Sequence, residues 1–282
     1  MLVYKIIINF DFDVVLKADQ ACHEVNSWVE QETNGLITEL LHPSAVSKFT
    51  RLIFANALHF KGEWKHKFDA SFTYPCDFHL LDGTSVKVPC MTTCYSQYYI
   101  RAFDDFKILG LPYKQGTNKK CQFSMYILLP DAKDGHSALI EKMASESGFF
   151  EGKLPRRKME VRYFMIPKFD ISFSFEASEV LKESGVVSPF SQPDADFTKV
   201  VKVNSPLDEL YVESLFQKAF IKVHEKGTEA AAATIMNLRG GGDPPPGLDF
   251  VANHPFLFLI REKFTGTILF VGQVLCPLQG AD

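Results

Sequence analysis

The residues that could carry out catalysis are few and scattered along the chain. No GxGxxG, GxxxxGK[ST], HExxH or GxSxG motif occurs. His59 lies in a β-prone run, where a core or interface histidine is a simpler interpretation than a base. The acidic pair Asp104-Asp105 and the basic run Lys153–Lys158 fit solvated surface turns better than a carboxylate dyad or an anion site. Nothing assembles a nucleophile, a base and an oxyanion hole, so the sequence makes no positive case for an enzyme.

The segment 227–248, GTEAAAATIMNLRGGGDPPPGL, differs in composition from the rest of the chain. It has no large aromatic residue and contains runs of four alanines, three glycines and three prolines. A loop of this length inside a compact domain is usually functional or disordered. If the segment is extended, its alternate residues share one face; a helical turn over Ala230–Ala233 is the other interpretation, because alanine favours helices.

The elements around this segment are those of a mixed α+β protein. Helices are expected over Asp19–Glu39, His136–Phe149 and Ala177–Ser184. Strands are expected over Met1–Asp11, Arg51–Trp64, Phe78–Pro89, Phe106–Pro112, Cys121–Pro130, Met159–Phe175, Leu207–His224, Phe256–Ile260 and Gly266–Leu275. Asp82-Gly83 predicts a hairpin turn, and Pro167 a break. Because no βαβ alternation occurs, we expect mostly antiparallel sheets in a single domain, residues 1–282.

Composition excludes several classes of protein. The chain has 282 residues, 46% of them apolar, and a formal net charge of −4, which argues against disorder and against nucleic acid as the main partner. No stretch approaches the roughly 18 apolar residues that span a bilayer, so no membrane partner is expected. The first residues lack the pattern of a signal peptide.

The cysteines indicate the compartment. The six cysteines are scattered and form no CxxC pair, so we expect free thiols in a reducing environment. No Asn-x-Ser/Thr sequon occurs either. Both observations favour a cytoplasmic protein, with an extracellular location as the alternative.

Three separated motifs resemble the serpin family. The run His224–Thr234 resembles the serpin hinge, and Phe250–Arg261 resembles the C-terminal signature. The pattern Asn56…Phe60-Lys61-Gly62-x-Trp64 is similar to the third strand of sheet A and its breach tryptophan.

The resemblance extends over most of the chain, from about Ala21 to Pro277. Val25–Val29 resembles the helix that lies across sheet A. The sequence as a whole looks like those of plant serpins with a Leu-Arg bait. It implies an α+β serpin-like fold, with large mostly antiparallel sheets, packed helices and an exposed reactive loop at about 227–248.

The resemblance also implies a mechanism, that of a suicide substrate. A protease attacks a bait bond in the loop and forms an acyl-enzyme, and the loop then inserts into sheet A as a new strand. The implied hinge residues are Glu225, Gly227, Thr228, Glu229, Ala230, Ala231, Ala232 and Ala233. Gly227 lets the backbone swing because it lacks a Cβ. Small side chains at Thr228, Ala230, Ala232 and Thr234 would enter the sheet without a clash.

The bait bond has two candidates. Counting back from Phe250, Leu238-Arg239-Gly240 matches the plant Leu-Arg bait, so that Arg239 would enter an acidic specificity pocket. Counting forward from Gly227 gives Gly241-Gly242 instead. A loop two residues short would insert roughly 7 Å less, at about 3.3 Å per residue.

Two departures from the family pattern bear on inhibition. Only Met1–Gln20 precedes the matched helix, so the resemblance implies an N-terminally truncated member that lacks helices beneath sheet A. Gln217 stands where the family usually has a shutter histidine, opposite Asn56; glutamine still forms hydrogen bonds, but in a different network.

We therefore predict a serpin-family inhibitor of serine or cysteine endopeptidases, and not an enzyme. The expected partner is a trypsin-like, metacaspase or papain-like protease, with no cofactor and no metal, and the protein is expected to be a monomer. The alternative is a non-inhibitory serpin homologue, in which truncation and the short loop prevent trapping. A hydrolase is the third and weakest hypothesis.

Overall fold

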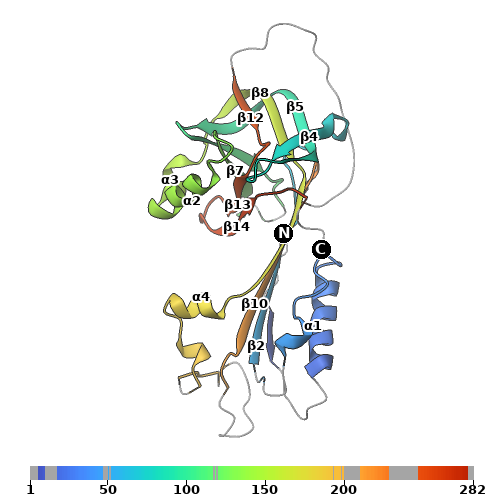
Figure 1. Cartoon of the computed structure of the whole chain (residues 1–282), viewed down its shortest axis with the longest axis vertical. Helices are drawn as coiled ribbons and strands as arrows, with labels where there is room; N and C mark the ends of the chain where they lie inside the picture. The colour runs from blue at the N-terminus through green and yellow to red at the C-terminus, as the bar shows by residue number, and fades with distance from the viewer. Residues whose placement is uncertain are drawn as a thin grey trace. The chain divides into compact units, whose positions relative to one another are not determined.

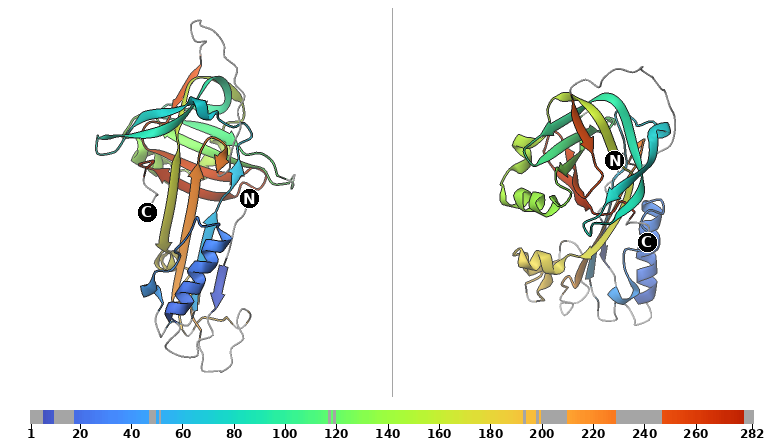
Figure 2. Two further views of the ribbon diagram at one scale, coloured as in Figure 1. Left: turned by 90° about the vertical axis from the view of Figure 1, so that its right-hand side faces the viewer. Right: turned by 45° about the horizontal axis from the view of Figure 1, so that its top comes forward.

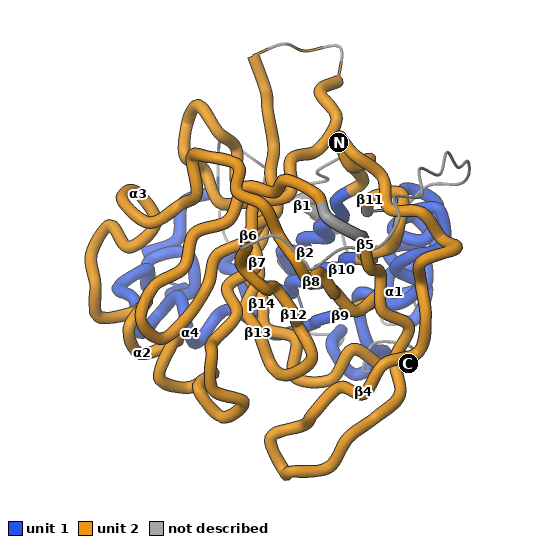
Figure 3. The backbone as a smooth tube through the Cα atoms, turned by 90° about the horizontal axis from the view of Figure 1, so that it is seen from above, with its two compact units in different colours: residues 1–60, 172–221 blue, residues 61–171, 222–282 orange. Residues whose placement is uncertain are grey.

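The chain divides into two compact units, each built from two separate stretches of sequence. Unit 1 comprises residues 1–60 and 172–221, and unit 2 comprises residues 61–171 and 222–282 (Figure 3). The structure, a computed structural model, describes residues 6–9, 18–46, 50, 52–116, 118, 120–192, 194–197, 199, 210–228 and 247–278. The prediction of a single domain stays a prediction.

Unit 1 is centred on a four-stranded sheet in the order β1-β2-β10-β9 (Figure 1). Its strands are β1 (Ile6–Asn9), β2 (Leu52–His59), β10 (Ser214–Val223) and β9 (Phe169–Glu176). The last two residues of β10 and the first three of β9 belong to unit 2. β1 is antiparallel to β2, whereas β2 and β10 are parallel. Its helices are α1 (Ala18–Glu32) and α4 (Ser178–Glu183), with short 3₁₀ turns at η1 (Pro43–Ala45) and η3 (Ser188–Phe190).

Helix α1 covers one face of this sheet (Figure 2). Its apolar residues at helical spacing, among them Val25 and Val29, pack against the alternate side chains Ile53, Ala55 and Ala57 of β2. The helix ends where Gly35, at φ +80°, donates its N–H to the carbonyl of residue 30 at 2.8 Å. Asn56 alternates with these buried residues and therefore lies on the face away from α1.

Unit 2 contains a larger sheet in the order β12-β8-β5-β6-β7-β13-β14, with β4 paired to β5. Its strands are β4 (Thr73–His79), β5 (Ser85–Ala102), β6 (Phe106–Pro112), β7 (Phe123–Pro130), β8 (Lys158–Pro167), β12 (Leu248–Val251), β13 (Phe256–Glu262) and β14 (Ile268–Val274). The predicted hairpin at Asp82-Gly83 joins β4 to β5, and the predicted break at Pro167 separates β8 from β9. A second, two-stranded sheet pairs β3 (Gly62–Glu63) with β11 (Gly227–Thr228).

Two helices cover one side of the large sheet (Figure 1), and a 3₁₀ turn precedes β4. These elements are α2 (His136–Ser145), α3 (Phe149–Lys153) and η2 (Ala70–Phe72). Leu139 of α2 and Phe149 of α3 pack with Phe106, Leu128 and Leu257 of three strands. Phenylalanine side chains from both strands and helices thus contribute to this core.

The cysteines correct one expectation. Cys76 of β4 and Cys90 of β5 form a disulfide, with their Cα atoms 6.0 Å apart, so the prediction of six free thiols is wrong for this pair. The hairpin brings the two residues together, although 14 positions separate them in sequence. Free cysteines therefore no longer support the expected cytoplasmic location, which stays a prediction.

No helix in the described part of the chain combines the length and apolar character needed to cross a membrane.

Candidate functional site

The first part of the candidate site lies between the parallel strands β2 and β10 of unit 1. Their register runs from Ile53↔Ser214 to His59↔Phe220 and places Gln217 directly opposite Asn56. Nδ2 of Asn56 donates a hydrogen bond to Oε1 of Gln217 at 3.2 Å. This hydrogen bond joins the side chains of the two strands, so separating the strands requires it to break.

The second part is the turn that follows β10, which lies in unit 2. His224 and Gly227 exchange two backbone hydrogen bonds, of 3.1 and 3.2 Å, so the chain reverses its direction within four residues. β11 then pairs with β3 in antiparallel register, Gly227 opposite Glu63 and Thr228 opposite Gly62. Gly227 and Thr228, from the segment predicted as a hinge, therefore form a two-residue strand that pairs with β3.

Gly227 is held against the backbone of β3. Its φ is +143°, and a Cβ built on it would lie 2.1 Å from the carbonyl oxygen of Gly62 and 2.6 Å from Cα of Glu63. No side chain fits at such distances. Glycine is therefore required here by close approach of two backbones, in addition to the freedom of movement that the sequence predicts.

Trp64 anchors the same turn. Its Nε1 donates to the carbonyl oxygen of His224 at 2.8 Å, and its backbone N–H donates to that of Lys226 at 2.9 Å. The indole stacks on Tyr113 with 4.6 Å between ring centroids, and Trp64 is 2% exposed. The side chain thus fixes the turn by hydrogen bonds on one side and by aromatic packing on another.

Glu225 forms the polar side of the turn. Its Oε1 accepts hydrogen bonds from Thr73 Oγ1 at 2.9 Å and from Lys168 Nζ at 3.1 Å, and its backbone carbonyl accepts from Phe68. Burial by itself raises the pKa of the Glu225 carboxyl. Hydrogen bonds from its own backbone N–H, Thr73 and Lys168 outweigh burial, so the net pKa lies below its usual value.

The other predicted site residues fall mostly outside the described residues. These are Glu229, Ala230, Ala231, Ala232 and Ala233 of the hinge, and Leu238, Arg239, Gly240, Gly241 and Gly242 of the two bait candidates. For Thr228, the backbone pairing is described and the side chain is not.

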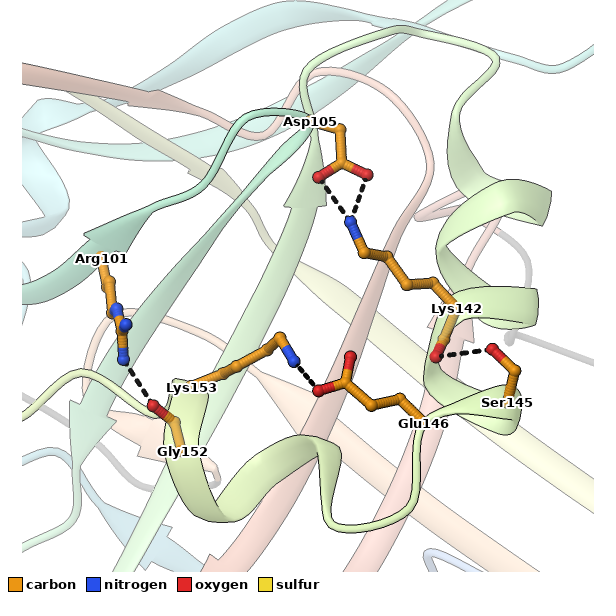
Figure 4. Close-up of polar contacts among 7 residues, drawn as sticks. All are labelled: Arg101, Asp105, Lys142, Ser145, Glu146, Gly152 and Lys153. Carbon is orange, nitrogen blue, oxygen red and sulfur yellow. Dashed lines mark hydrogen bonds and ion pairs between the residues drawn. The ribbon is translucent and has the colours of Figure 1, made fainter.

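The residues considered for catalysis have structural roles. His59 is buried, with its ring 6.4 Å from that of Phe220. Figure 4 shows the polar contacts around α2 and α3. Asp105 accepts two hydrogen bonds from Lys142 Nζ, at 2.9 and 2.8 Å, and Lys153 pairs with Glu146. These ion pairs tie the helices to neighbouring segments.

Sequence reasoning missed the supporting residues of the turn. Thr73, Lys168 and Tyr113 belong to three segments that lie between 9 and 104 positions from Trp64 in the numbering. No local pattern marks them, because each has its role only through a tertiary contact. Of the three, Thr73 offered a signal in the sequence, because it is a polar residue at the start of β4.

A turn thus follows β10, which is parallel to β2, and the buried Trp64 anchors that turn. The profile of the family described as Serpin (serine protease inhibitor) matches residues 9–277. The chain belongs to the serpin family.

The similar proteins include plant serpins. The chain is 51% identical over 268 residues to Serpin-ZX of Arabidopsis thaliana, covering 94% of this chain and 68% of that protein. It is 52% identical over 272 residues to Serpin-ZXA of Oryza sativa subsp. japonica, covering 95% and 67%.

The fold is similar to those of solved serpins. A structure of Arabidopsis AtSerpin1 in its native stressed conformation matches with a TM-score of 0.79 and 48% identity, over 95% of this chain and 68% of that chain. Uncleaved ovalbumin matches with a TM-score of 0.72 and 27% identity, over 94% and 68%. The predicted α+β serpin fold is confirmed, and the chain is a protease inhibitor of the serpin class whose partner is a protease.

Proposed function

We propose that this chain inhibits endopeptidases as a suicide substrate, by inserting the segment after Gly227 between β2 and β10. The observation that carries the proposal is the parallel pairing of these two strands, together with the tight reversal of the chain at 224–227 that follows β10 in the sequence. A segment that reverses after β10 runs antiparallel to β10, and therefore antiparallel to β2 as well.

The inserted strand would exchange one ladder for two. Insertion breaks the parallel ladder of β2 and β10, including the hydrogen bond between Asn56 and Gln217. It forms two antiparallel ladders in return, and antiparallel pairing is slightly more stable per residue than parallel pairing. The exchange therefore favours insertion once the loop is free to move.

The order of events begins at the hinge. Glycine at position 227 and the pairing of Thr228 with Gly62 mark where β11 must leave β3 before insertion proceeds. Alternation then sends residues 228, 230, 232 and 234 to one face of the inserted strand and residues 229, 231 and 233 to the other. A bulky charge on the first face blocks entry, and one on the second face is tolerated.

The bait we propose is the bond after Arg239, with Gly241-Gly242 as the competing bond. An arginine at the bait fits proteases with an acidic specificity pocket, either trypsin-like serine proteases or metacaspases. A papain-like cysteine protease is a further target, since a thiol nucleophile forms the same type of acyl-enzyme. We propose that the inhibitor acts as a monomer.

The test is incubation with trypsin followed by a denaturing, reducing gel and mass spectrometry of the fragments. A band at the summed mass of the two proteins supports trapping. Cleavage after Arg239 without that band means a non-inhibitory homologue.

Two variants separate insertion from recognition. Thr228→Arg should abolish the covalent band and leave cleavage intact. Glu229→Arg, one position further and on the other face, is the matched control and should still trap. Equal trapping by both variants would contradict insertion along this register.

A further inference from the structure

A cavity of about 270 Å³ lies within unit 2, next to the tryptophan that anchors the hinge turn. Its walls come from Trp64–His66 after β3, Ser96–Tyr99 of β5, Gly110–Pro112 of β6, and Lys158 at the start of β8. Pockets for drug-sized ligands span roughly 300–1,000 Å³. This cavity therefore has room for a molecule of one or two rings.

Aromatic side chains form rigid walls. Trp64 is stacked on Tyr113, and Tyr98 is stacked on Phe164 with 4.3 Å between ring centroids. Burial raises the pKa of Tyr98 to about 12, so its hydroxyl, which lies 3.3 Å from Thr93 Oγ1, remains a neutral phenol. Walls of this kind favour a flat, apolar ring.

The lysine and histidine side chains at the cavity are all basic. Lys65, His66 and Lys158 line it, and no lining residue is acidic. Burial lowers the pKa of His66, and the charges of Lys158 and Lys65 lower it further, which places both ammonium groups within electrostatic reach of the imidazole. Within the described part of the chain, neither lysine forms an ion pair. Their charges are therefore available to an anion.

We propose that this cavity binds an aromatic carboxylic acid of one or two rings. The ring lies between the aromatic walls, and the carboxylate faces the Lys65, His66 and Lys158 side. Lys158 contributes to both parts of the site. Its Nζ carries a positive charge and lies 5.7 Å from the ring centroid of Tyr99, one of the aromatic residues that line the cavity.

Binding here has a consequence for the hinge. Trp64 lines the cavity with part of its surface and donates from Nε1 to the carbonyl of His224. A ligand that packs against this indole stabilises the state in which the turn is anchored and opposes its release. This consequence rests on the proposed function, whereas binding itself does not, so a calorimetric test applies whether or not the chain traps proteases.

The experiment is isothermal titration calorimetry of the full chain with 2-naphthoate, and with the uncharged 2-naphthamide as the matched ligand. We expect binding of naphthoate at least tenfold tighter than of naphthamide, because a hydrogen bond to a charged group contributes a factor of about ten or more. Lys158→Gln should remove most of this difference. Lys87→Gln is the control variant: Lys87 lies on β5, as Tyr99 does, but forms an exposed ion pair with Asp77. This variant should keep the difference in affinity between naphthoate and naphthamide.

A second variant tests the location independently of charge. Ser96→Trp fills the cavity from β5 and should abolish binding of both ligands, with an unchanged circular dichroism spectrum as the check on folding. Absence of naphthoate binding at millimolar concentration, equal affinity for the acid and the amide, or unchanged affinity in Lys158→Gln or Ser96→Trp would each overturn the proposal.

Discussion

At the scale of the residue, Gly227 has a role that its flexibility alone does not describe. Its positive φ and its contact with the carbonyl of Gly62 make it a required part of the docked hinge. Because glycine has no Cβ, it permits the close approach to β3 in the docked hinge, and it also permits the backbone to move when the hinge is released. Substitution should therefore damage the docked state before any protease is present.

Gly227→Ala should lower the melting temperature, because the new Cβ would overlap the backbone of β3. A strained backbone of this kind costs on the order of 1–3 kcal/mol, or roughly 2–12 °C for a chain of this size. Thermal unfolding followed by circular dichroism measures the shift. Gly152→Ala is the control, since a Cβ there meets nothing within 4 Å and Gly152 lies in helix α3; equal melting temperatures for the two variants would contradict the close approach.

Glu225 should make stability depend on pH. Its folded-state pKa is below the unfolded value of about 4.3, so between the two values the folded chain binds fewer protons than the unfolded chain. The contribution of Glu225 is complete above the unfolded pKa and is lost as the pH falls through the folded pKa. Glu225→Gln should be less stable at pH 7 and should lose less stability on acidification.

Urea unfolding of wild type and Glu225→Gln between about pH 7 and pH 3 measures this difference. The groups around the carboxylate are Thr73, Lys168 and His224, which the substitution leaves in place. Glu141→Gln, on the exposed surface of α2, should keep the pH dependence of the wild type. Parallel curves for all three proteins would rule out the role of Glu225.

At the scale of the element, β12 is where the chain returns from the loop into the large sheet. Its parallel pairing with β8 is short, and it is reinforced by Arg162, which donates from Nε and Nη2 to the two carboxylate oxygens of Asp249 at 2.9 and 2.7 Å. Such a bidentate pair is geometrically specific, although both side chains are partly exposed.

Arg162→Gln should loosen β12 without unfolding the sheet. A partly exposed pair contributes up to about 1 kcal/mol, so the amides of Leu248–Val251 should exchange with deuterium roughly fivefold faster. Hydrogen exchange with mass spectrometry measures this. Lys87→Gln removes the exposed pair with Asp77 and should leave β12 unchanged; faster exchange throughout unit 2 would instead indicate a global effect.

Local patterns predicted the elements better than they predicted the site. The turn residues Asp82-Gly83 and the break at Pro167 predicted the β4–β5 hairpin and the end of β8, because their chemistry acts within a few residues. The close approach of Gly227 to Gly62 and the disulfide of Cys76 with Cys90 depend on register, which a single sequence does not reveal. The cavity could not be predicted for the same reason, since its lining comes from four separate segments of the chain.

At the scale of the whole molecule, the proposed function predicts that the intact chain is not in its most stable state. Cleavage in the loop frees the segment after Gly227 to enter between β2 and β10, where it gains hydrogen bonds on both sides. The melting temperature should therefore rise by more than about 10 °C after cleavage, since each kcal/mol corresponds to roughly 2–4 °C in a domain of this size. Differential scanning calorimetry before and after limited digestion with trypsin measures the rise.

Thr228→Arg, cleaved in the same way, should show no rise, because its charge cannot enter the sheet, and Glu229→Arg should show the full rise. A wild-type chain that is cleaved after Arg239 but melts at its original temperature would mean that β2 and β10 do not open, and that the chain is the non-inhibitory homologue.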